Sequence, residues 1–175
     1  AAINAGGVTI HSFFQLAPGL YLPGQNIAGR EQSSKYSFSK HKINILRSLD
    51  LLVIDEVSMV RCDLLDAIDE VLRRYQNRNL PFGGVQLLLI GDLQQLAPVT
   101  SEDEWQLMRQ HGYITPYFFG SQALMKTDYT TIELTHVYRQ ADQTFVNMLN
   151  QVRDNQIDAN PLNVLNSRYL PNFEP

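Results

Sequence analysis

The chain has one cysteine, no excess of basic residues and no long hydrophobic run, and each shortage excludes a class of protein. Cys62 alone cannot form an internal disulfide or a multi-thiolate metal site. With 14 Lys and Arg against 18 Asp and Glu, the net charge of -4 gives no overall basic surface, so any contact with nucleic acid must be local. No apolar run approaches the roughly 18 residues of a membrane span, and no secretory signal opens the chain. These features predict a soluble, cytoplasmic protein with no membrane partner.

The length of the chain and the residue at which it begins limit the possible architectures. A chain of 175 residues with 44% apolar content can bury one ordinary core and begin a second domain. It starts at Ala1 without an initiator Met and in the middle of a pattern, which predicts a fragment of a longer protein. Proline, glycine and serine residues across 17–37 predict a long surface loop.

Helical and buried-strand patterns alternate through the middle of the chain. Apolar residues recur at helical spacing across 39–49 and 61–78. Each of these segments precedes a continuous apolar run, the first at 51–54 and the second within 85–92. Two such runs without alternation predict a parallel sheet buried on both faces, and therefore an α/β fold.

The patterns beyond the second strand are shorter. An acidic helix start is expected at 101–104, a strand at 129–134 and a helix at 142–154. Past Asn160 the pattern fades into proline, asparagine and serine. We therefore expect the tail to lack a core of its own.

Two adjacent carboxylates, Asp55 and Glu56, follow the first expected strand. In an open parallel sheet, ligands bind at the carboxyl ends of the strands, so both side chains emerge where a nucleotide would lie. Asp55 could hold Mg2+, usually through water, and Glu56 could orient and activate an attacking water. The alternative is that the pair only places negative charge at the start of the next helix.

Polar residues also follow the second and third expected strands. After the second strand, Gln94 or Gln95 could donate to a phosphate oxygen and so sense a terminal phosphate, whereas the alternative is a polar turn stopped by Pro98. After the third strand, Arg139 could stabilise charge in phosphoryl transfer, or it could form only a surface ion pair.

Four segments together resemble successive motifs of superfamily-one helicases: GGVTIHSFF, LLVIDEVSM, LLLIGDLQQLAPV and ELTHVYRQ. They are most similar to the PIF family, with RecD-type enzymes as near relatives, and the resemblance spans residues 1 to about 153. It implies a RecA-like P-loop NTPase sheet flanked by helices, with ATP and Mg2+ as cofactors. It also implies that Asp55 binds the metal, Glu56 is the catalytic base and Gln95 senses the terminal phosphate. Arg139 would contact that phosphate from the hinge between two RecA-like domains.

The same resemblance implies a nucleic-acid partner. Family members couple ATP hydrolysis to movement along single-stranded DNA and to unwinding at duplex junctions, in DNA repair, recombination or genome maintenance, with five-prime to three-prime polarity. In GGVTIHSFF, Thr9, His11 and Ser12 could hydrogen-bond DNA phosphates, although His11 could instead be an interior histidine. Phe13 and Phe14 could stack on bases, but core positions are expected for both. A bacterial member would be associated with the nucleoid.

The family pattern is incomplete in one respect. The phosphate-binding loop G-x-x-x-x-G-K-[ST] does not occur, because Gly6 and Gly7 have no following Lys-Ser or Lys-Thr. We therefore expect residues 1–134 to form a partial first RecA-like domain, truncated at its N-terminus, and 135–175 to form the hinge and the start of the second. Such a fragment should hydrolyse ATP poorly or not at all. The alternatives are a degenerate RecA-like domain that acts as a DNA- or protein-binding scaffold, and an unrelated α/β domain with chance matches.

Overall fold

The structure is a computed structural model, and it describes residues 6–24, 38–138 and 140–171. The chain divides into two compact units, Ala1–Tyr129 and Thr130–Pro175. This division falls close to the domain boundary predicted after residue 134, which stays a prediction. Much of the loop expected across 17–37 lies outside the described residues. Within those residues, no helix has the length and apolar character that a membrane span needs.

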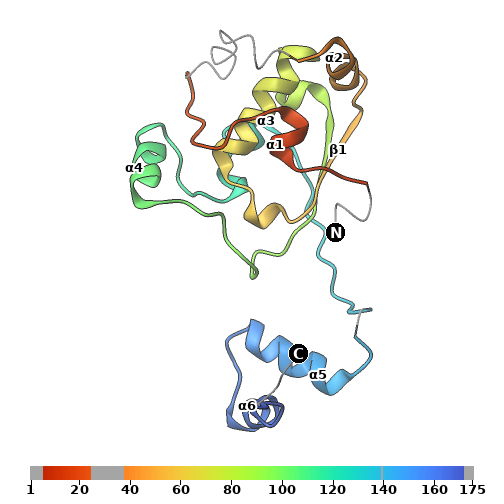
Figure 1. Cartoon of the computed structure of the whole chain (residues 1–175), viewed down its shortest axis with the longest axis vertical. Helices are drawn as coiled ribbons and strands as arrows, with labels where there is room; N and C mark the ends of the chain where they lie inside the picture. The colour runs from red at the N-terminus through yellow and green to blue at the C-terminus, as the bar shows by residue number, and fades with distance from the viewer. Residues whose placement is uncertain (1–5, 25–37, 139, 172–175) are drawn as a thin grey trace. The chain divides into compact units, whose positions relative to one another are not determined.

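The first unit packs a short parallel sheet and several helices around helix α3 (Figure 1). Its helices and strands follow in the order α1 (Ile10–Phe14), α2 (Lys40–Arg47), β1 (Leu51–Ile54), α3 (Cys62–Tyr75), β2 (Gln86–Leu89) and α4 (Glu102–Gln110). Short 3-10 turns lie between them at η3 (Val57–Met59), η4 (Pro81–Gly84), η5 (Phe118–Gly120) and η6 (Leu124–Lys126). The predicted alternation of helices and strands is confirmed, with bounds that differ by a few residues.

Strands β1 and β2 are parallel neighbours, as predicted, with Val53 opposite Leu88. The prediction that both faces of the sheet are buried is wrong for the described chain. Leu52 and Ile54 face the core, whereas Val53 is 50% exposed and Leu88 is 47% exposed. The reason is that the described elements pack against only one face of this two-stranded sheet.

Helix α3 supplies most of the core on that covered face. Its predicted apolar stripe is buried throughout: Leu64, Leu65, Ile68, Val71 and Leu72. The stripe packs with Phe14 of α1, Leu46 of α2 and Phe82 of η4, all of them buried. Since a fully buried leucine or isoleucine side chain contributes about 1.5–3 kcal/mol, this helix holds the unit together.

Helix α4 begins with the acidic turn that the sequence predicts. Ser101 Oγ accepts a hydrogen bond from Glu104 N at 3.2 Å, and Glu104 Oε2 accepts one from Ser101 N at 3.0 Å. This reciprocal pair satisfies two backbone donors at the start of the helix. The far end of α4 packs into a small second cluster, in which Met108 and Tyr113 are buried and Trp105 is partly buried.

The strand predicted at 129–134 is wrong. Residues 129–134 form no strand or helix, and Ile132 is 79% exposed and Leu134 89% exposed. A strand needs a neighbouring chain for its backbone N–H and C=O groups, and no described segment pairs with this one.

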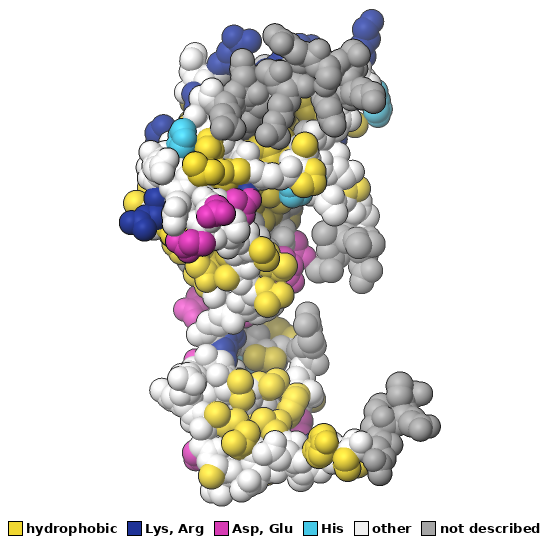
Figure 2. Space-filling view, turned by 60° about the vertical axis from the view of Figure 1, so that its left-hand side comes forward, with side chains coloured by type: hydrophobic (Ala, Val, Ile, Leu, Met, Phe, Trp, Pro, Cys, Tyr) yellow, Lys and Arg dark blue, Asp and Glu magenta, His cyan; other side chains and the backbone are white. Residues whose placement is uncertain are grey.

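The second unit contains two helices, α5 (Gln143–Arg153) and α6 (Ala159–Asn166). Helix α5 confirms the helix predicted at 142–154, whereas α6 lies where the sequence pattern fades and no helix was predicted. Asp158 begins α6 by accepting a hydrogen bond from Asn160 N at 3.0 Å, a capping signal that was overlooked. Hydrophobic side chains gather on the surface of this unit (Figure 2). Leu149 of α5 and Leu162 of α6 are 45% and 46% exposed.

Candidate functional site

The carboxyl ends of β1 and β2 lie side by side, and the residues that follow them are tied together by backbone hydrogen bonds. Ile90 N donates to Ile54 O at 2.9 Å, and Val57 N donates to Ile90 O at 2.9 Å. The second bond joins the turn after β1 to the residue after β2. Asp55 and Glu56, which lie between these anchors, are therefore held at the edge where both strands end.

Glu56 has an unusual backbone conformation at this edge. Its φ of 54° and ψ of 41° fall in the left-handed region, which a glutamate rarely adopts, and its amide donates to Asp55 Oδ1 at 3.0 Å. Within the described residues, Glu56 gives η3 no capping hydrogen bond, and α3 begins only after Arg61. Side-chain capping therefore does not explain the acidic pair. Sparse backbone conformations of this kind cluster at functional sites.

Asp92 organises the turn after β2. Its carboxylate accepts hydrogen bonds from Gln94 N at 3.0 Å and from the side-chain amide of Gln95 at 3.1 Å, and its carbonyl accepts one from Gln95 N at 3.1 Å. Both glutamines are exposed, and the Gln95 side chain is oriented by Asp92. A turn agrees with both interpretations of this segment, a phosphate sensor and a plain polar turn. Sequence reasoning assigned no role to Asp92.

A side chain at Gly91 would crowd the close approach of the two strand ends. A Cβ atom at this position would lie 3.0 Å from Val57 N and 3.1 Å from Ser58 N. Both neighbours are backbone atoms of the turn that follows Glu56, so they cannot move aside as a flexible side chain would. The absence of a side chain at Gly91 lets the acidic turn and the Asp92 turn meet.

The remaining predicted residues lie outside this edge of the sheet or outside the described residues. Arg139 belongs to the latter group, and its contact stays a prediction. Thr9, His11 and Ser12 are exposed together at the start of α1, where Thr9 Oγ1 caps the helix by accepting from Ser12 N at 3.2 Å. Because His11 is exposed, the interior-histidine alternative is wrong.

The core positions predicted for the two phenylalanines are confirmed. Phe14 is 2% exposed, and the partly buried Phe13 packs edge-on against it with ring centroids 4.9 Å apart. Lys42 Nζ lies 3.4 Å from the centroid of the Phe13 ring, and burial lowers the pKa of Lys42. The Phe13 ring is thus engaged by the core and by a cation.

Three aspartates at every third position of α3 fasten loops to the helix. Asp63 is fully buried and accepts a hydrogen bond from Tyr21 N at 2.9 Å, and Asp69 accepts one from Phe82 N. Burial raises the pKa of Asp69. Sequence reasoning missed these residues, although Asp at this spacing beside an apolar helical stripe was a usable signal.

Asp66, the middle aspartate of the three, is the acceptor for four donors. Tyr113 Oη donates to it at 2.7 Å, Ala123 N at 3.0 Å and Gln122 N at 3.1 Å, and Ser121 Oγ donates to it as well. Burial and the nearby Asp66 charge raise the pKa of Tyr113, so its hydroxyl remains a donor at neutral pH. One carboxylate therefore anchors the chain that returns to α3 after α4.

Comparison with known proteins agrees with this architecture. The PIF1-like helicase family model matches residues 1–162. The chain is 38% identical over 154 residues to the ATP-dependent DNA helicase PIF1 of Homo sapiens, covering 87% of this chain and 21% of that protein. It is 36% identical over 160 residues to PIF1 of Candida albicans, covering 90% of this chain and 17% of that protein. The chain thus spans about a fifth of the length of these curated relatives.

Solved structures share the fold. The structure of Pif1 helicase from Bacteroides in complex with ADP-AlF3 and ssDNA superposes with a TM-score of 0.86 at 38% identity, covering 97% of this chain and 38% of that one. Pif1 from Candida albicans superposes with a TM-score of 0.75 at 31% identity, covering 99% of this chain and 36% of that one. The predicted RecA-like α/β fold is confirmed by these likenesses. By its sequence match and its fold, the chain belongs to the PIF1-like helicase family.

Proposed function

We propose that this chain supplies part of the ATP-hydrolysing site of an ATP-dependent DNA helicase. The observation that carries the proposal is the meeting of the Asp55-Glu56 turn with the Asp92 turn at one edge of the sheet, through the Val57 N to Ile90 O bond of 2.9 Å. Ligands of open parallel sheets bind at this edge. Relatives of the family carry the name ATP-dependent DNA helicase, which supports the same activity for the parent of this chain.

The acidic pair fits a magnesium nucleotide. Mg2+ takes oxygen donors and keeps several waters, so one or two carboxylates suffice, and Asp55 and Glu56 supply them. Asp55 is assigned to the metal, through water, and the exposed Glu56 carboxylate to the attacking water, from which it would accept a proton. When bound, the metal would neutralise charge on the terminal phosphates.

The sensing role belongs to Gln95 in this proposal. Its side-chain amide is held by Asp92 at 3.1 Å, so one of its hydrogens remains for a phosphate oxygen. Arg139 is assigned to the same terminal phosphate, where a guanidinium stabilises charge that develops during transfer.

The start of α1 is proposed as a contact for DNA phosphates. The side chains of Thr9, His11 and Ser12 are exposed together, and hydroxyl and imidazole groups commonly bind the sugar-phosphate backbone. The name of a related structure, Bacteroides Pif1 bound to ssDNA, supports single-stranded DNA as the partner. Duplex junctions, DNA repair, recombination, five-prime to three-prime movement and a cytoplasmic or nucleoid location are proposed for the parent protein on the family resemblance.

The domain assignment follows the same logic. We assign residues 1–134 to a first RecA-like domain and 135–175 to the hinge and the start of a second one. Because no G-x-x-x-x-G-K-[ST] loop occurs in these 175 residues, we expect the isolated chain to hydrolyse ATP poorly.

Steady-state ATP hydrolysis, measured with and without single-stranded DNA, tests the proposal. The assay compares the parent protein with the 175-residue chain alone. We expect DNA-stimulated turnover in the parent and none in the chain. Absence of turnover in both would overturn the proposal and favour the scaffold alternative, in which the domain binds DNA or protein without hydrolysis.

A further inference from the structure

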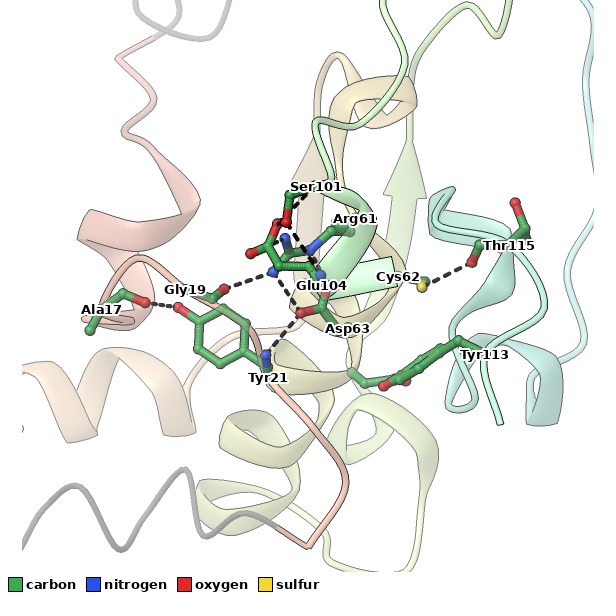
Figure 3. Close-up of polar contacts among 11 residues, drawn as sticks. Ala17, Gly19, Tyr21, Arg61, Cys62, Asp63, Ser101, Glu104, Tyr113 and Thr115 are labelled. Carbon is green, nitrogen blue, oxygen red and sulfur yellow. Dashed lines mark hydrogen bonds and ion pairs between the residues drawn. The ribbon is translucent and has the colours of Figure 1, made fainter. Parts of the chain in front are cut away.

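Arg61 joins three segments that lie far apart in the sequence (Figure 3). Its Nε donates to Asp63 Oδ1 at 2.6 Å and its Nη2 to Asp63 Oδ2 at 2.8 Å, a two-point pairing with the first turn of α3. The Nη2 group also donates to Gly19 O at 2.7 Å, and Nη1 donates to Glu104 Oε1 at 3.2 Å. All three guanidinium nitrogens are therefore used, each in a direction that the planar group fixes.

The junction is shielded from solvent, which makes it stiff. The Arg61 side chain is 13% exposed, that of Asp63 is 0% exposed and that of Glu104 is 34% exposed. Asp63 also accepts from Tyr21 N at 2.9 Å, so the loop that contains Gly19 is held at two points. Breaking the pairing with Asp63 would leave a buried charge without its partner, which costs much more than breaking a pair in water. Glu104 is more exposed, and Arg61 keeps both hydrogen bonds to Asp63 when Glu104 is changed.

Each of the three joined segments lies a few residues beyond a part of the proposed motor. The loop through Gly19 follows helix α1, whose start carries the proposed DNA contacts. Arg61 itself follows the turn that begins with Glu56. Glu104 lies in α4, the first helix after the turn that holds Gln95. The Arg61 side chain therefore connects three segments: the loop after the proposed DNA contact on α1, the segment after Glu56, and helix α4, which follows the Gln95 turn.

We propose that Arg61 is a positioning residue that couples the nucleotide edge to the DNA contact on α1, through Glu104 on one side and Gly19 on the other. This inference rests on the proposed helicase function. A shift of the Gln95 turn on nucleotide binding moves α4. The Arg61 guanidinium, which is bonded to Glu104 of α4 and to Gly19, transmits that shift to the loop after α1. The coupling is reciprocal, so DNA bound at α1 favours the nucleotide-competent arrangement.

Glu104 offers a conservative way to cut this connection. Both of its carboxylate oxygens are used, since Oε1 accepts from Arg61 and Oε2 accepts from Ser101. A glutamine has a single acceptor oxygen and can therefore serve only one of the two partners. Hydrogen bonds from Ser101, followed by Arg61, lower the pKa of Glu104, so the carboxylate is charged at neutral pH. Glu102→Gln is the matched control, because the Glu102 side chain is exposed in the same turn and makes no hydrogen bond to the described residues.

The experiment measures ATP hydrolysis by the parent protein across a titration with single-stranded oligonucleotide. For Glu104→Gln we expect basal turnover and the thermal midpoint of unfolding to match those of Glu102→Gln. The DNA concentration for half-maximal stimulation should rise by roughly fivefold or more, the lower bound of typical coupling between sites. Arg61→Lys, which keeps the charge but loses the planar fork, should shift the same quantity further.

Three outcomes separate the possibilities. If wild-type parent shows no DNA stimulation, the proposed function fails and the coupling fails with it. If the wild type is stimulated and Glu104→Gln and Arg61→Lys respond to DNA as Glu102→Gln does, only the coupling is overturned. If Glu104→Gln lowers basal and stimulated turnover equally together with the thermal midpoint, Arg61 and Glu104 have a purely structural role, which also overturns the coupling.

Discussion

Asp66→Ala should destabilise the first unit because one carboxylate accepts from several buried donors. The change leaves Tyr113 Oη, Ser121 Oγ and Ala123 N without their acceptor, and these three residues are 2%, 0% and 7% exposed. An unsatisfied buried donor costs about 1–3 kcal/mol. A neighbouring open cavity of about 730 Å³, lined by Asp66, Tyr113 and Ala123, admits water and holds each cost near the lower bound. We therefore expect a loss of about 3 kcal/mol in the free energy of unfolding.

Urea unfolding followed by tryptophan fluorescence measures this loss. Trp105 is the sole tryptophan and packs in the cluster that contains Tyr113, so its emission reports on the anchored region. A loss of about 3 kcal/mol lowers the urea midpoint by roughly 1–3 M. Asp66→Asn, which keeps one acceptor oxygen, should fall between the wild type and Asp66→Ala. The reasoning is refuted if Asp66→Ala unfolds at the same urea concentration as Asp128→Ala, a change at an exposed aspartate.

Two further predictions concern Cys62 and Gly91. Burial raises the pKa of Cys62 to about 12, so the thiol of the folded chain stays protonated at pH 9. The folded chain should therefore react with a thiol reagent far more slowly than the chain unfolded in 8 M urea. Equal reaction rates would contradict this prediction. By the same linkage, the unfolded thiol ionises first, so stability should fall as pH rises from about 8.5 towards the folded pKa. Gly91→Ala forces a Cβ to 3.0 Å from Val57 N and should cost about 1–3 kcal/mol, and an unchanged urea midpoint would show that the two turns are not tightly packed.

The sequence correctly predicted those elements whose apolar pattern lies within one continuous segment of the chain. The buried stripe of α3 is confirmed, and the apolar run at 51–54 correctly predicted a strand, although it did not predict that one face of β1 is exposed. The segment 129–134 has strand-forming residues such as Ile132, but a strand forms only where a neighbour supplies hydrogen bonds. Propensity without a partner was therefore insufficient there.

Some residues of the candidate site could likewise be predicted from the sequence, and others could not. Asp55 and Glu56 could be singled out because polar residues that directly follow a buried strand must emerge at the edge of the sheet. The roles of Asp63 and Asp66 could not, because their partners lie 42 residues away at Tyr21 and 57 residues away at Ala123. These hydrogen bonds depend on where distant loops pack against α3, and the spacing of residues along the sequence does not predict that packing.

The central claim, that the edge formed by β1 and β2 hydrolyses ATP, is tested most directly by Glu56→Gln in the parent protein. Nucleotide affinity and single-turnover hydrolysis would be measured side by side, with Glu102→Gln as the control. If Glu56 activates the attacking water as proposed, the change should lower the hydrolysis rate by roughly 100-fold or more while nucleotide affinity stays nearly unchanged. Hydrolysis at the wild-type rate would contradict the account.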